Sequence, residues 1–244
     1  MGDKKNYKER FKNDAIVKYY DNKEYHKHSY YSLIWELEKE ILFKEISNFS
    51  KSHIDYLDFA CGTGRVISFL ENYVATSIGV DISKNMLNAA ENKVKTSKLI
   101  QRDIIKNPLN QKFDVITSFR FFLNAENNLR KGVLKEIKKM MKTDSIFIFS
   151  IHGNKYSFRC FTFLLNSILF GKKLNQMSYF DVVELLDKEG FVILNYYGLG
   201  FLPKFLYRLK IFNKILFSID KMLAKINILR MFSHNLIFVV KKNE

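Results

Sequence analysis

Short apolar runs alternate with longer amphipathic segments from residue 55 to the C-terminus. Apolar runs of four to eight residues predict strands, and apolar residues spaced three or four apart predict helices. The expected strands are residues 55–59, 76–80, 98–102, 113–119, 145–151, 191–197 and 235–241. The expected helices between them are residues 65–73, 83–95, 127–141 and 180–189. This alternation predicts an α/β fold with a mainly parallel, doubly wound sheet.

Three segments fall outside the alternation, namely residues 13–48, 156–170 and 199–232. Residues 13–48 read as helical, with an apolar face from Leu33 to Ile46 and Ser29 or Ser32 as the candidate cap. Apolar residues also recur every three or four positions from Phe205 to Ile226, among many lysines and arginines. We therefore expect one domain over residues 1–244. It would carry an N-terminal helical cap (1–49) and two helical additions (155–178 and 199–233), which form a lid or a surface that contacts a membrane.

A glycine turn, Asp58-Phe59-Ala60-Cys61-Gly62-Thr63-Gly64, directly follows the first expected strand. Glycine allows close approach of a ligand, and the following helix exposes free backbone N–H groups. The dinucleotide fingerprint requires a third glycine where this chain has Ile67, which disfavours a dehydrogenase. A carboxylate at Asp58 would repel a pyrophosphate but would attract a cationic ligand.

Two more acidic residues end the second and third expected strands. Asp81 lies about 20 residues after the glycine turn, the usual distance for an acid that binds ribose hydroxyls. Asp103 could accept a proton of an adenine amino group, with Ile82 and Ile104 on the two sides of the ring. Each acid alone is more simply a helix cap or a solvated turn residue. Three acids at the ends of three successive strands instead indicate a nucleoside site.

These motifs together resemble those of the class I S-adenosylmethionine (SAM)-dependent methyltransferases, in the branch that acts on small molecules and lipids. The resemblance covers about residues 50–153 and lies in four segments: 58–65, 80–87, 102–103 and 113–116. It implies a Rossmann-like, seven-stranded sheet whose last strand is antiparallel, an enzyme that transfers methyl groups, and SAM as cofactor. The residues expected to contact SAM are Asp58, Ala60, Gly62, Gly64, Asp81, Ile82, Met86, Asp103, Ile104, Ser118 and, from an N-terminal helix that closes over the cofactor, Tyr20.

The acceptor side is less constrained, because methyl transfer mainly requires a nucleophile held in line with the sulfonium. Acceptor residues should follow the fourth and fifth strands. Arg120 would suit an anionic acceptor or would form a salt bridge with a nearby acid. His152 is either the general base or a structural imidazole. Cys61 and Cys160 have neither disulfide nor metal-ligand spacing, so we predict no metal site.

The net charge of +15 leaves several partners open. It suits a solvated lysine-rich surface, an anionic membrane surface or nucleic acid. The motifs of nucleic-acid methyltransferases, Asn/Asp-Pro-Pro-Tyr/Phe and a Pro-Cys pair, are missing from the sequence. We therefore expect an O or N atom of a small or lipid-linked acceptor (saccharide, quinone or lipid) to be methylated. The alternatives are a nucleic-acid methyltransferase and a non-catalytic SAM-binding protein.

The location of the protein is expected from two features. The N-terminus is charged rather than apolar, and the longest apolar run, residues 160–170, is shorter than a membrane span. We expect a cytoplasmic protein, peripheral on the inner membrane face if the basic segments bind lipid.

Overall fold

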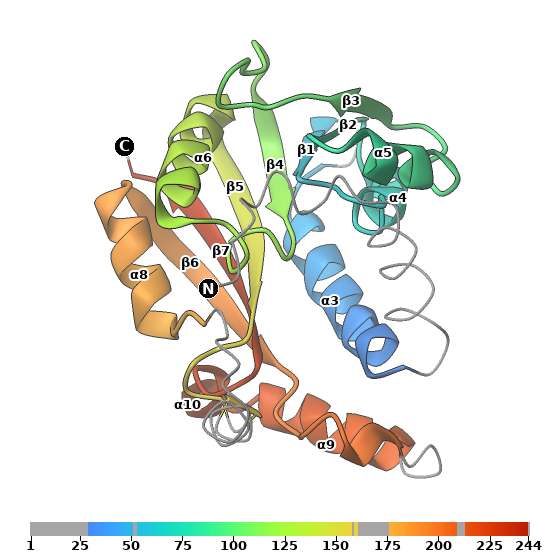
Figure 1. Ribbon diagram of the computed structural model, residues 1–244, viewed down its shortest axis with the longest axis vertical. Helices are drawn as coiled ribbons and strands as arrows, with labels where there is room; N and C mark the ends of the chain where they lie inside the picture. The colour runs from blue at the N-terminus through green and yellow to red at the C-terminus, as the bar shows by residue number, and fades with distance from the viewer. Residues whose placement is uncertain (1–28, 51–52, 158, 161–175, 209–212, 244) are drawn as a thin grey trace, which may run out of the picture.

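A seven-stranded sheet forms the centre of the protein in the computed structural model, which describes residues 29–50, 53–157, 159–160, 176–208 and 213–243 (Figure 1). The strands are β1 (Asp55–Phe59), β2 (Thr76–Asp81), β3 (Lys98–Gln101), β4 (Phe113–Ser118), β5 (Met141–His152), β6 (Phe191–Leu199) and β7 (Asn235–Lys242). Their order is β3-β2-β1-β4-β5-β7-β6. β1 to β5 pair in parallel, and β7 is antiparallel to both of its neighbours. The expected doubly wound sheet with an antiparallel last strand is confirmed.

Helices cover both faces of this sheet (Figure 1). One layer holds α6 (Asn127–Met140) and α8 (Tyr179–Lys188). The other holds α3 (Tyr30–Ile46), α4 (Ile67–Leu70), the 3-10 turn η3 (Glu71–Tyr73) and α5 (Lys84–Glu91). Side chains alternate between the two cores along each strand, as Phe147 and Ile148 of β5 show. Burial on both faces explains the continuous apolar runs 146–149 in β5 and 236–240 in β7.

The ends of the helices follow the polar residues of the sequence. Ser29 caps α3 by accepting the N–H of Ser32 at 3.0 Å, and Ser83 caps α5 through Met86 at 3.3 Å. Gly190, with a φ of 73°, ends α8. The caps fix where each helix starts relative to the preceding strand, so the loops at the carboxyl ends of the strands have defined positions.

Some expected boundaries differ from the structure. The expected helix 65–73 begins as α4 only at Ile67, and the expected helix 83–95 ends at Glu91. β5 begins at Met141, where a helix was expected to end. Lys142 therefore lies in a strand, and its Nζ is 2.6 Å from Asp55 and 2.7 Å from Asp114. This ion cluster joins the amino-terminal ends of β1, β4 and β5.

The C-terminal addition consists of short helices: η4 (Leu206–Arg208), α9 (Asn213–Ala224) and α10 (Asn227–Arg230). A single apolar helix stripe from Phe205 to Ile226 was expected, and this expectation is wrong because Ile226 is extended and precedes α10. Asp220 fixes α9 by accepting the N–H groups of Phe201 (2.8 Å) and Leu202 (3.1 Å). Among the described residues, no helix is both long and apolar enough to cross a membrane.

Parts of the expected cap and lid lie outside the described residues. These are residues 1–28, which include Tyr19 and Tyr20, and residues 161–175 of the first helical addition.

Candidate functional site

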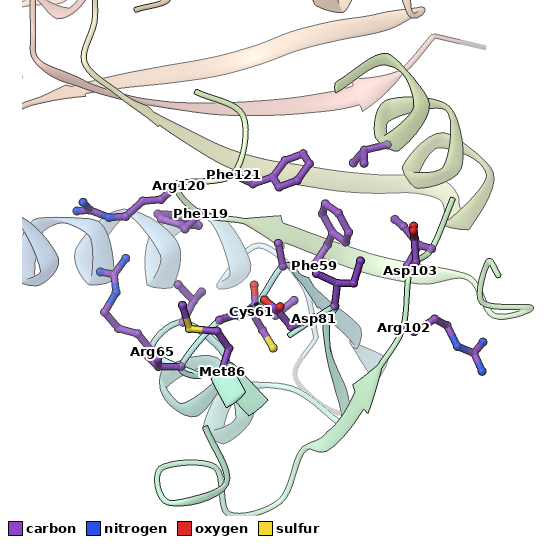
Figure 2. A pocket seen from close by; sticks show the side chains of 18 of the residues that line it. Phe59, Cys61, Arg65, Asp81, Met86, Arg102, Asp103, Phe119, Arg120 and Phe121 are labelled. Carbon is purple, nitrogen blue, oxygen red and sulfur yellow. Dashed lines mark hydrogen bonds between the residues drawn. The ribbon is translucent and has the colours of Figure 1, made fainter. Parts of the chain in front are cut away.

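A cavity opens at the carboxyl ends of β1 to β4, with an empty volume of about 1060 Å³ that includes its open mouth (Figure 2). Its walls come from the glycine turn, the end of β2 with the start of α5, the loops after β3 and β4, and α6. Of the expected site residues, it brings together Asp58, Ala60, Gly62, Asp81, Ile82, Met86, Asp103, Ile104 and Arg120.

Asp81 is locked against the glycine turn. Its Oδ2 accepts the backbone N–H of Gly62 at 2.9 Å, and its Oδ1 accepts that of Ser83 at 2.8 Å. Gly62 has a φ of 54°, a left-handed conformation that suits glycine. Desolvation raises the pKa of Asp81, although the hydrogen bonds from Ser83 and Gly62 lower it. Each carboxylate oxygen keeps a second lone pair, so Asp81 can still accept hydrogen bonds from two ligand hydroxyls.

Gly64 supports the site without lining it. Its φ is 78°, and a Cβ built on it would lie 2.8 Å from the Cβ of Ala90 in α5. Real Cβ atoms do not approach so closely, so the backbone of Gly64 packs directly on α5. The second glycine of the turn therefore allows the contact between two elements of the cavity wall.

Asp58 is the most deeply buried acid of the cavity, with 1% of its surface exposed. Its Oδ1 accepts the hydroxyl of Thr117 at 2.7 Å, and Thr117 Oγ1 is 2.6 Å from the Tyr56 hydroxyl. Because Thr117 donates to Asp58, the Tyr56 hydroxyl must donate to Thr117. Oδ2 of Asp58 is buried without a hydrogen bond to the described residues.

The surroundings of Asp58 disfavour its charged form. Burial raises its pKa to about 7, while the Thr117 hydroxyl, the nearby Ile67 amide and the charge of Arg65 act in the opposite direction. A buried carboxyl with an unsatisfied oxygen is a fitting partner for a cationic ligand group, whose charge would favour ionisation.

The opposite wall is largely apolar. Ile104 is 1% exposed and Ile82 is half-buried, while the rings of Phe59 and Phe121 meet edge to face at 5.0 Å. Asp103 lies at the edge of this wall, and its Oδ1 accepts the N–H of Ile105 at 3.2 Å. Apolar surfaces beside a carboxylate suit a flat aromatic ring that carries an amino group.

The far end of the cavity is cationic, and Figure 2 shows Arg65 and Arg120 together beside α3. Glu38 of α3, 2% exposed, lies 2.6 Å from Arg65 Nη1 and 3.9 Å from Arg120 Nη2. Arg65 also stacks over the ring of Trp35, 4.3 Å from its centroid. Arg120 has a φ of 64°, unusual for a residue with a side chain, and its N–H donates to Ser150. Arg120 thus forms the expected salt bridge, with a long distance of 3.9 Å to Glu38, and its side chain also lines the cavity.

Sequence reasoning missed Glu38 and Thr117 as parts of this site, and it quoted Arg65 only within a motif. The apolar spacing of α3 indicated its buried face, but an acid on that face could not be matched to partners 27 and 82 residues away.

Two expected site residues lie elsewhere, and a third is outside the described residues. Ser118 is buried at the end of β4, outside the cavity wall. His152 is half-buried at the end of β5, opposite Asn235 of β7, and also outside that wall. Its neighbour His234 has a pKa well below the usual value because of burial and the nearby charges of Arg159, His152 and Arg120. Tyr20 lies outside the described residues.

Comparison with known proteins now adds to this geometry. A family model described as "Methyltransferase domain" matches residues 57–149, the segment that contains the glycine turn and most of the cavity wall. The chain is 30% identical over 202 residues to a demethylmenaquinone methyltransferase of Leptospira interrogans, which covers 67% of this chain and 78% of the relative. It is 28% identical over 221 residues to an uncharacterized protein of Methanocaldococcus jannaschii, over 80% of this chain and 82% of that one.

Solved structures share the fold. The magnesium protoporphyrin IX methyltransferase of Synechocystis with bound S-adenosylhomocysteine (SAH) superposes with a TM-score of 0.69 at 13% identity, covering 97% of this chain and 98% of that one. A SAM-dependent methyltransferase of Clostridium acetobutylicum gives a TM-score of 0.60 at 17% identity, covering 86% and 92%. At these identities the likeness concerns the arrangement of helices and strands.

Proposed function

Because the chain belongs to the class I SAM-dependent methyltransferases and uses SAM as its cofactor, we propose that it methylates an O or N atom of a small or lipid-linked acceptor. The observation that supports this proposal most directly is the convergence of Asp58, Asp81 and Asp103 on one cavity beside the glycine turn. Three acids from three strands fit the ammonium, ribose and adenine groups of one nucleoside.

The cofactor residues have separate tasks in this proposal. Asp58, buried and with one unsatisfied oxygen, would hold the ammonium group of the cofactor. Asp81 would accept the ribose hydroxyls while it keeps the amides of Gly62 and Ser83. Asp103 would accept from the adenine amino group, with the ring between Ile82, Met86 and Ile104. We retain Ala60 as a backbone contact, and Ser118, Gly64 and Tyr20 as supporting residues.

The acceptor would enter beside Arg120, at the cationic end of the cavity. Bound SAM supplies an electrophilic methyl group on a sulfonium. The task of the chain is to hold the acceptor atom in line with that group and to exclude water. The guanidinium of Arg120 lines the cavity and can orient an anionic acceptor, because it is a planar group with a permanent positive charge. His152 stays a candidate base that would reach the acceptor from the end of β5.

The names of the relatives support the acceptor class. One relative is named for demethylmenaquinone, a second for malonyl-[acyl-carrier protein], and a structural neighbour for magnesium protoporphyrin IX. None of these names specifies nucleic acid, and all three specify an acceptor of the small or carrier-linked kind.

Calorimetric titration with SAM and SAH tests the cofactor site. The wild type should bind both, and Asp81→Ala should weaken binding by at least about tenfold because charged hydrogen bonds to the ligand are lost. Asp81→Asn keeps the shape of the side chain and separates charge from packing. Asp187→Ala, an exposed acid on α8, is the matched control and should bind normally. If Asp81→Ala binds SAM and SAH as tightly as the wild type does, the assignment of Asp81 to the cofactor site is wrong.

Incubation of cell extracts with the protein and deuteromethyl-labelled SAM identifies the acceptor class. We expect label in a small molecule or a lipid fraction, detected by mass spectrometry. Label confined to RNA or DNA would instead support the nucleic-acid alternative. If His152 is the base, His152→Ala should lower kcat while SAH binding stays normal.

A further inference from the structure

Within the described part of the chain, an apolar surface on the C-terminal helices is left exposed. Ile215, Ile219 and Met222 of α9 are exposed by 59%, 37% and 57%. Ile226, directly before α10, is exposed by 43%, and Ile228, within α10, by 73%. We call these five residues the α9–α10 apolar face. Soluble surfaces rarely gather large aliphatic side chains in this way, so the face indicates a binding partner.

The spacing shows that this face is distinct from the packed side of α9. Ile215, Ile219 and Met222 follow each other at intervals of four and three, which places them on one side of the helix. The other side carries the buried residues Asn213 and Asp220. Asp220 holds that side through the amides of Phe201 and Leu202 and the Tyr207 hydroxyl. α9 is therefore fixed by one side while the other stays apolar and open.

Positive charge surrounds the face. Between residues 200 and 232 the sequence has seven basic residues, Lys204, Arg208, Lys210, Lys214, Lys221, Lys225 and Arg230. The one acid of that segment, Asp220, is 1% exposed. Lys214 and Lys225 are exposed next to the face, whereas Lys221 pairs with Glu40 of α3 at 2.7 Å. An apolar face beside exposed lysines is complementary to a lipid bilayer with anionic headgroups.

We propose that the α9–α10 apolar face docks on the surface of an anionic lipid bilayer. Ile215, Ile219 and Met222 would enter the boundary between headgroups and acyl chains, and Lys214 and Lys225 would contact the headgroups. Nucleic acid fits less well, because its backbone would attract the lysines but would leave the isoleucines in water. The proposal goes beyond the acceptor assignment and does not rest on it.

The position of the face gives such docking a consequence for the enzyme. α9 and α10 lie at the end of the molecule where β4 and β5 finish (Figure 1). Asn154 follows β5 closely in the sequence. Its side-chain Nδ2 donates to the backbone carbonyls of Met231 (2.6 Å) and Ser233 (2.8 Å), which follow α10. A bilayer on this face would therefore lie against the same end of the sheet as the acceptor loops.

Co-sedimentation with vesicles tests the proposal on the full chain. Vesicles of equal parts phosphatidylcholine and phosphatidylglycerol should bind the protein, phosphatidylcholine alone should bind it weakly, and salt should reduce binding. Lys214→Glu with Lys225→Glu should lower partitioning about 25-fold or more, since each lysine near the surface contributes about fivefold. Ile215→Asn with Met222→Asn should lower it about tenfold.

Matched controls separate docking from folding and from catalysis. Leu194→Asn removes an exposed leucine from β6, and Lys112→Glu reverses the charge of an exposed lysine directly before β4. Neither should change vesicle binding. SAH binding should persist in every variant, so failure of docking and failure of the cofactor site are distinguishable. Absence of vesicle binding in the wild type overturns the proposal. Self-association that the Ile215→Asn/Met222→Asn variant abolishes, without vesicle binding, also overturns it and assigns the face to a second copy of the chain.

Discussion

Asp58 combines two properties that oppose each other in the free protein. Its burial disfavours a negative charge, yet a cationic ligand needs that charge. The hydrogen-bond chain from Tyr56 through Thr117 satisfies one oxygen and leaves the other for the ligand. In the proposed cofactor site, Asp58 would therefore exchange some stability of the free enzyme for electrostatic affinity toward the cofactor, as expected at functional sites.

This opposition predicts a pH-dependent stability. The pKa of Asp58 is about 7 in the folded protein, above its value of 3.8 in an unfolded chain. Because the pKa of Asp58 is higher in the folded protein, its contribution to the free energy of unfolding is fully present below pH 3.8 and is lost as the pH rises to about 7. Between these limits the wild type should lose up to about 1.4 kcal/mol per pH unit relative to Asp58→Asn, which cannot titrate. Urea unfolding of both proteins between pH 5 and 7 measures this difference.

The same substitution should have the opposite effect on binding. Asp58→Asn lacks the charge that we propose holds the cofactor ammonium, so its affinity for SAH should fall by at least about tenfold at neutral pH. Wild-type affinity should rise from pH 5.5 to 7 as Asp58 ionises, and the variant should show no such rise. A parallel pH dependence in both proteins would contradict this role of Asp58.

At this scale, the sequence predicted residues whose position depends on strand ends. Asp58, Asp81 and Asp103 could be placed because parallel strands end at one edge of the sheet. Glu38 could not, because its partners Arg65 and Arg120 meet it only through tertiary packing. Ser118 and His152 also end strands, but the strand-end rule does not determine to which side a side chain points.

Among the elements, the contact between the glycine turn and α5 depends on Gly64. Gly64→Ala should cost about 2–4 kcal/mol, since strain at a positive φ adds to overpacking against Ala90. Gly62→Ala is the matched comparison, because its φ is also positive but no atom lies within 4 Å of the added Cβ. It should cost about 1 kcal/mol in the same urea titration. Equal losses would show that packing on α5 is unimportant.

The attachment of α3 to the cavity depends on Glu38. Glu38→Gln would remove the buried carboxylate charge that pairs with the guanidinium groups of Arg65 and Arg120, at a cost of about 3 kcal/mol. Glu40→Gln, two residues along the same helix, breaks an exposed pair with Lys221 and should cost less than about 1 kcal/mol. Thermal unfolding of the two variants at one pH measures the difference. Similar melting temperatures would mean that the charge of Glu38 does not stabilise the attachment.

Element types followed from the sequence where periodicity and caps agreed. All seven strands and the cap at Ser83 were identified in this way, and the cap of α3 was narrowed to Ser29 or Ser32, of which the structure has Ser29. α9 shows why the remaining elements could not be identified from the sequence. It has apolar residues on both sides, so the predicted stripe joined Leu216, which packs on the core, to Ile219, which is exposed. Periodicity cannot distinguish a face that packs inward from one left for a partner.

On the scale of the whole molecule, the strand order determines where the site lies. The strand order reverses between β1 and β4. On one side of this point the sheet continues from β1 to β2 and β3, and on the other side it continues from β4 to β5 and β7. Ligands of open α/β sheets bind outside the strands at such a reversal. The sequence predicted the alternation of elements, and the resemblance supplied the antiparallel last strand.

The cavity draws its walls from residues 58 to 133, so ligand binding should stabilise the domain as a unit. SAH at 100 times its Kd should add about 2.7 kcal/mol, which corresponds to about 5–10 °C in Tm for a chain of this size. Lys142 lies at the amino-terminal ends of the strands, away from the cavity. Lys142→Ala should therefore lower the Tm of the free protein but keep this ligand shift. Asp81→Ala should lose the shift. Scanning calorimetry of the three proteins with and without SAH measures it. A ligand shift lost equally in Lys142→Ala would contradict a binding site confined to the cavity, because the shift depends on ligand affinity and not on the stability of the free protein.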